Sequence, residues 1–152
     1  MAIPYENATS GAKAREDITK LLRRFGAESV GFMDEFDSHS VSLAFTYRGR
    51  RIQLRASAEG WANLYLREHP WNTRRVRDKR AYQEHVLAQG MVSVNSMLRD
   101  WVKGQVTAIE CGMTRFDHVF LPYMLTNQGH TVAEVLTDER IDQLTHQPES
   151  NA

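Results

Sequence analysis

Two arginine-rich clusters are the residues with the clearest chemical potential in this sequence. The first comprises Arg48, Arg50, Arg51 and Arg55. The second comprises Arg74, Arg75, Arg77, Lys79 and Arg80, flanked by Trp71 and Tyr82. Arginine presents a planar fork that binds phosphate with two hydrogen bonds, and aromatic side chains stack on unpaired bases. The two clusters therefore predict a nucleic-acid partner, either DNA or RNA.

The same clusters have two other interpretations. They are also typical of a solvated surface, and they could pair within the chain with acidic residues near its C-terminal end (Glu134, Asp138, Glu139 and Asp142). The 19 basic and 19 acidic residues give a formal net charge of zero. This balance argues against a protein that coats DNA through bulk positive charge, so any nucleic-acid site must be local.

Catalytic and cofactor-binding patterns are missing from the sequence. The histidines have no metal-ligand spacing, and no glycine-rich phosphate loop occurs. The single cysteine, Cys111, has no nucleophile pattern around it and is typical of a small core residue. Asp34, Glu35 and Asp37 could form a metal-dependent nuclease site with Glu110, although Glu110 belongs to a helical pattern. We expect no cofactor and no resident metal, and the nuclease is the least favoured hypothesis.

Length and composition indicate one domain. The chain has 152 residues, of which 41% are hydrophobic and 25% charged, values close to those of ordinary globular domains. We expect a single α+β domain over residues 1–145 and a disordered tail over residues 146–152. No apolar run is long enough to cross a bilayer, and the first residues lack the features of a signal peptide. Together with the lone cysteine, this predicts a cytoplasmic protein without a membrane partner.

The first half of the chain predicts a helix followed by three antiparallel strands. Apolar residues recur at helical spacing from Ser10 to Phe25, and Gly26 suits the end of that helix. The strands fall between Ser29 and Ser57. If Arg48-Gly49 is a two-residue turn, apolar residues of the second and third strands oppose one another as Phe45–Ile52, Leu43–Leu54 and Val41–Ala56. A slip of one residue would destroy this match, so the register supports the hairpin, with a looser turn or a bulge as the alternative.

The second half predicts a mostly helical region. A short helix from Ala58 to Arg67 precedes a basic loop over residues 71–80, and a long helix then runs from Tyr82 to Glu110. Gly90 and Gly104 mark either a break in the long helix or the close approach of another element. Two further helices are expected over residues 115–125 and, from a capping box at Thr131, over residues 132–145. The aromatic stripe Phe116, Phe120, Tyr123 and Met124 predicts either a core face or an exposed docking face.

Two resemblances add to these expectations. The order of a helix, three antiparallel strands and a helix over residues 10–67 is similar to that of the double-stranded-RNA-binding domain. The lysine-rich phosphate clamp that opens the last helix of that family is absent here, where the matching residues are 57–62. The segments 43–50 (LAFTYRGR) and 101–106 (WVKGQV) resemble small uncharacterised proteins of phages and prophages. That resemblance implies a bacterial or phage setting and an accessory role.

These observations favour a non-enzymatic accessory protein that binds nucleic acid through the arginine-rich hairpin and loop. The alternative hypothesis is a protein-interaction module, either an inhibitor of a host protein or a self-assembling subunit. Because the sequence contains no catalytic pattern, its functional surfaces must be located from the fold.

Overall fold

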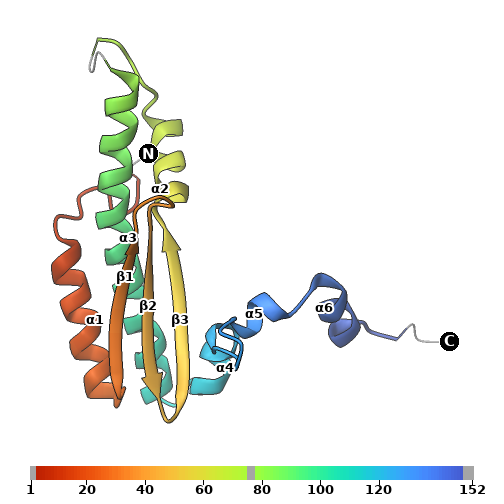
Figure 1. Cartoon of the computed structure of the whole chain (residues 1–152). Coiled ribbons are helices and arrows are strands. Elements are labelled where there is room, and N and C mark those ends of the chain that lie inside the picture. Colours follow the sequence, from red (N-terminus) through yellow and green to blue (C-terminus); the bar gives the residue numbers. More distant parts are fainter. Residues whose placement is uncertain (1–2, 75–77, 149–152) are drawn as a thin grey trace.

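The computed structural model describes residues 3–74 and 78–148 and shows an α+β fold, as the sequence predicted. A three-stranded antiparallel sheet with the order β1-β2-β3 lies against helices α1 and α3, and its other face is uncovered (Figure 1). The N-terminal half of α3 continues beyond the sheet and packs against α2. The elements are α1 (Gly11–Phe25), β1 (Ser29–Glu35), β2 (Ser40–Tyr47), β3 (Arg50–Ser57), α2 (Ala58–Glu68), α3 (Lys79–Glu110), α4 (Phe116–Phe120), the 3-10 helix η1 (Leu121–Tyr123), α5 (Val132–Val135) and α6 (Asp138–Thr145).

The β2–β3 hairpin has the register predicted from its apolar residues. Phe45 pairs with Ile52, Leu43 with Leu54 and Val41 with Ala56. The two-residue turn is also confirmed, since Tyr47 pairs with Arg50 and the two residues between them, Arg48 and Gly49, both have positive φ. Positive φ at both positions is the geometry of a type I′ turn, which arginine adopts less readily than asparagine.

Helix α3 is the longest element of the described structure and is continuous over 32 residues. It begins earlier than predicted, at Lys79, because the Asp78 side chain caps it by accepting from the backbone N–H of Arg80 at 2.9 Å. Neither glycine breaks the helix. Gly90 instead allows α2 to approach, with the Ala58 carbonyl only 3.1 Å from the position that a side-chain carbon would take. Gly104 faces open space.

The chain before α1 is tied to α2 and α3 by hydrogen bonds. The Pro4 carbonyl accepts from the Trp61 indole at 2.8 Å, and the Tyr5 carbonyl accepts from the Ser93 hydroxyl at 2.9 Å. The Tyr5 hydroxyl donates to Asp100 at 2.8 Å. These bonds give partners to polar side chains of α2 and α3, among them Ser93, which is fully buried.

A polar contact joins α1, β1 and α3 beside the main core. Arg15 of α1 donates to both carboxylate oxygens of Asp34 in β1 and, through Nε, to the Asn95 side chain of α3 at 2.9 Å. Its guanidinium also lies 5.3 Å from the centre of the Phe32 ring. The Arg15 hydrogen bond holds the pKa of Asp34 below its usual range. Three elements that are far apart in sequence are thus fixed by one side chain.

The C-terminal third differs most from the sequence-based expectation. The predicted helix over residues 115–125 ends at Phe120 and continues only as a 3-10 turn, because Pro122 cannot donate a helical hydrogen bond. The predicted helix over residues 132–145 is two helices. The Thr131 capping box is present, but α5 has only four residues, and Thr137 caps α6 separately. The part of the expected tail over residues 149–152 lies outside the described residues.

The aromatic stripe of this region belongs to the core. Phe120 is fully buried, and its ring lies 5.5 Å from that of Phe45 and 5.9 Å from that of Trp101, both at nearly right angles. Met124 is also buried. The core alternative is therefore correct for Phe120 and Met124, and Phe116 and Tyr123 are partly buried against the same core. A core position for Cys111 is wrong, because Cys111 is exposed at the end of α3.

Candidate nucleic-acid interface

One end of the molecule gathers basic side chains from two distant parts of the sequence. The β2–β3 turn supplies Arg48 and Arg50, and the loop after α3 supplies Arg115. All three line one groove of about 610 Å³. The hairpin turn and the C-terminal end of α3 lie at the same end of the structure (Figure 1), because the hairpin strands and the C-terminal half of α3 run side by side along the sheet. We call this groove and its three arginines the basic end.

Aromatic rings form the rigid base of the basic end. The Tyr47 ring lies 4.6 Å from Phe25, in a stacked arrangement, and 4.5 Å from Phe116. The Arg48 guanidinium lies 5.2 Å from the centre of the same Tyr47 ring. These contacts connect α1, the hairpin and α4, so the backbone that carries the arginines is well supported.

The three arginines of the basic end are exposed and make no ion pair with any other described residue. Asp117 also lines the groove, so the surface carries one carboxylate beside three guanidinium groups. An unpaired guanidinium retains all its donors for an external anion. The groove can therefore hold phosphate groups without breaking an internal ion pair.

The two remaining hairpin arginines are already engaged. Arg51 and Arg55 lie on the uncovered face of the sheet, as the register predicted. Arg55 reaches across β2 and pairs with Glu35 of β1 at 2.6 Å, and it also donates to Ser38 at 3.0 Å. Arg51 makes a longer bond to the Thr126 carbonyl at 3.4 Å. The first arginine cluster is thus available at the hairpin turn, whereas Glu35 neutralises Arg55 at the far end of the strands.

The described residues of the second predicted cluster lie at the opposite end of α3. Lys79 and Arg80 belong to the first turn of α3 and not to a loop, and Arg80 pairs with Glu84 at 3.2 Å. Lys79 lies 6.0 Å from the centre of the Trp71 ring, and the Tyr82 hydroxyl donates to the His69 carbonyl at 2.6 Å. Arg74 is exposed, whereas Arg75 and Arg77 lie outside the described residues.

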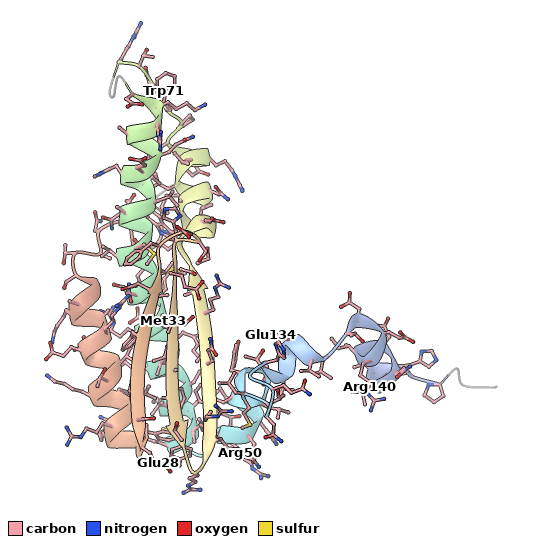
Figure 2. The ribbon with its side chains drawn as sticks, in the orientation of Figure 1. Glu28, Met33, Arg50, Trp71, Glu134 and Arg140 are labelled. Atoms are coloured by element: carbon pink, nitrogen blue, oxygen red, sulfur yellow. The ribbon has the colours of Figure 1, made fainter. Side chains whose placement is uncertain are left out.

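The two clusters do not form one surface. Figure 2 shows Trp71 and Arg50 at opposite ends of the long axis of the molecule. A helix of 32 residues is about 48 Å long, so a single groove cannot include both clusters. Arg115 joins the hairpin cluster instead. No sequence pattern marked Arg115, because its proximity to the hairpin arises only when α3 spans the sheet.

Three of the four carboxylates considered for a nuclease form ion pairs, and Glu110 lies on a different element from the others. Asp34 and Glu35 bond to Arg15 and Arg55 at one end of β1, whereas Glu110 lies near Arg24 at the end of α3, with a nitrogen–oxygen distance of 3.6 Å. Within residues 3–74 and 78–148, no group of three or more His, Cys, Asp or Glu is placed to hold a metal ion. A nuclease site assembled from these carboxylates therefore has no geometric support.

Comparisons with protein-family models, curated proteins and solved structures give no match for this chain. None of the helices within the described ranges has both the length and the apolar character needed to span a membrane.

Proposed function

We propose that this protein is a non-enzymatic accessory protein that binds nucleic acid at its basic end. The observation that carries the proposal is the convergence of Arg48, Arg50 and Arg115 on one groove without an ion-pair partner among the described residues. Three positive charges that line one groove suit contacts with the phosphates of a nucleic-acid backbone. A zero net charge is compatible with such a local site.

The packing of the groove favours phosphate contacts over base stacking. The Tyr47 ring is stacked on Phe25 and contacts Phe116, and Arg48 lies over it. Its faces are therefore used inside the protein and are not open to an unpaired base. Phosphate contacts carry no sequence information, so we expect binding with little sequence preference. Both DNA and RNA present the required phosphates.

Fluorescence anisotropy with labelled single- and double-stranded oligonucleotides at low salt tests the proposal. The variant R48E/R50E/R115E should lose binding. The control K13E/R67E/K103E makes the same charge change at exposed positions outside the groove, with Lys13 paired to Asp17 in the unmodified protein, and should retain most of the binding. Circular dichroism spectra and melting curves will show whether both variants fold. Failure of the unmodified protein to bind any of the oligonucleotides would refute the proposal.

The second arginine cluster is tested separately, since its described residues are remote from the groove. The variant R74E/R75E/R77E reverses three charges in the segment that precedes α3 in the sequence. If nucleic acid binds at the basic end, this variant should bind nearly as well as the unmodified protein. Loss of binding in this variant, with retention in R48E/R50E/R115E, would place the site at the other end of α3.

A further inference from the structure

The C-terminal helix α6 extends away from the body of the protein. All eight of its residues are exposed, and Figure 1 shows it beyond α5 on the β3 side. Ile141 and Leu144 are three residues apart and form an apolar stripe, with 41% and 62% of their surface exposed. An exposed apolar stripe on a helix of this kind indicates a surface that is covered by a partner.

The charge of α6 identifies the kind of partner. Asp138, Glu139 and Asp142 provide three carboxylates against one arginine, Arg140, which bonds to Gln143 at 3.3 Å. The helix is therefore acidic beside its apolar stripe. A surface that receives it must be basic at its rim and apolar at its floor.

The basic end has both properties. Its rim carries Arg48, Arg50 and Arg115, and its lining includes the apolar side chains of Ile109 and Phe116. Met113, in the loop beside the groove, has 84% of its surface exposed. The acidic helix and the basic groove are thus complementary in charge, and each offers apolar surface to the other.

We infer that α6 of one copy binds in the basic-end groove of a second copy of this chain. Only Leu136 and Thr137 separate α6 from α5, and α5 is held to the body by the bond from the Val132 N–H to the Met124 carbonyl at 2.9 Å. This short connection directs α6 outward. The contact uses two different surfaces and is heterologous, so it produces head-to-tail rings or open chains.

The contact should be weak and sensitive to salt. An eight-residue helix buries a small interface, typical of transient association, and its exposed charges are screened as the ionic strength rises. The groove is the one proposed above for nucleic acid. Self-association therefore competes with nucleic acid for the groove. The inference of self-association does not depend on the proposed nucleic-acid binding, since it needs no nucleic acid.

A charge-swap experiment with the full-length chain tests the inference. Sedimentation velocity is measured over a range of protein concentrations at low and high salt. The unmodified protein should associate at low salt. The arm variant D138R/E139R/D142R and the groove variant R48E/R50E/R115E should each be monomeric, because arm and groove then carry like charges. An equimolar mixture of the two should associate, because each arm meets a groove of opposite charge.

A second pair of variants separates the apolar contribution from folding defects. I141D/L144D changes two exposed residues of α6 and should abolish association. M33D changes an exposed residue on the open face of the sheet and should not. An unmodified protein that is monomeric at every concentration, or a mixture that stays monomeric, would overturn the inference. Nucleic-acid binding by I141D/L144D is an independent readout, since this variant leaves the groove intact and adds no positive charge.

Discussion

The close packing of α2 on α3 can be tested at a single position, Gly90. A side-chain carbon added there would lie 3.1 Å from the Ala58 carbonyl oxygen, 3.2 Å from the Ala58 Cβ and 3.3 Å from the Trp61 ring. The nearest atom belongs to the backbone, which yields less easily than the end of a flexible side chain. Gly104 lies on the same helix and has no neighbour within 4 Å, so Gly104→Ala is a matched control.

The magnitudes of the two substitutions follow from helix propensity and packing. Alanine stabilises a helix interior by about 1 kcal/mol relative to glycine, at either position. Overpacking in a tight contact costs about 1–3 kcal/mol. Gly104→Ala should therefore raise the free energy of unfolding by up to about 1 kcal/mol. Gly90→Ala should lower it by about 0–2 kcal/mol, because the packing cost offsets or exceeds the propensity gain.

Urea unfolding followed by circular dichroism measures both free energies under identical conditions. The difference between the two variants isolates the packing cost and should be about 1–3 kcal/mol. Equal stabilisation by both alanines would show that α2 does not approach α3 at Gly90. The close packing of α2 on the N-terminal half of α3 would then be refuted.

Three further predictions concern the core and the ion pairs. Phe120→Ala removes a fully buried ring that packs on Trp101 and should lower the free energy of unfolding by about 3–5 kcal/mol in chemical denaturation. Ser42→Ala should change that free energy by less than about 1 kcal/mol or raise it, because the buried Ser42 hydroxyl has no hydrogen-bond partner among the described residues, and a large loss in urea titration would contradict this. The pKa of Asp34 is lowered by its hydrogen bond to Arg15, so this pair stabilises the fold above the ordinary aspartate pKa and is lost as the pH falls through the lowered value. Asp34→Asn should flatten the acid side of the stability–pH curve by about 1 kcal/mol or less, since both side chains are partly exposed, and an unchanged curve would refute the pairing.

The register of the hairpin could be predicted because two features of its sequence, the apolar alternation and the turn length, agree on it. Apolar residues alternate on both strands, and the two-residue turn aligns Phe45 with Ile52. A one-residue slip would move every apolar side chain to the wrong face. The long helix could also be predicted from its apolar spacing. Of the two alternatives for its glycines, a break or a close approach, Gly90 shows the close approach and Gly104 shows neither.

The C-terminal helices could not be placed because their local signals are incomplete. The capping box at Thr131 correctly marks the start of a helix, but a cap does not specify length. The chain leaves the helix after four residues and restarts at the Thr137 cap, a break that the apolar pattern does not show. The sequence left two alternatives for Phe120, a core face or an exposed docking face, and tertiary packing decides between them.

The candidate site was only partly predictable for a related reason. Sequence spacing identified Arg48 and Arg50 as exposed turn residues, but the partner of Arg55 is Glu35, which lies two strands away. Arg115 lies beside the hairpin only because the C-terminal half of α3 runs along the sheet to the hairpin turn. Charge clusters in a sequence therefore predict local basicity, whereas pairing and convergence depend on the fold.

The salt dependence of nucleic-acid binding is the most direct test of the basic end. Each phosphate contact contributes roughly 0.7 to 0.9 to the slope of log affinity against log salt concentration. If Arg48, Arg50 and Arg115 contact phosphates, the variant R48A/R50A/R115A should bind with a slope smaller by about two to three than that of the unmodified protein. Identical slopes for the two proteins would contradict phosphate binding at the basic end.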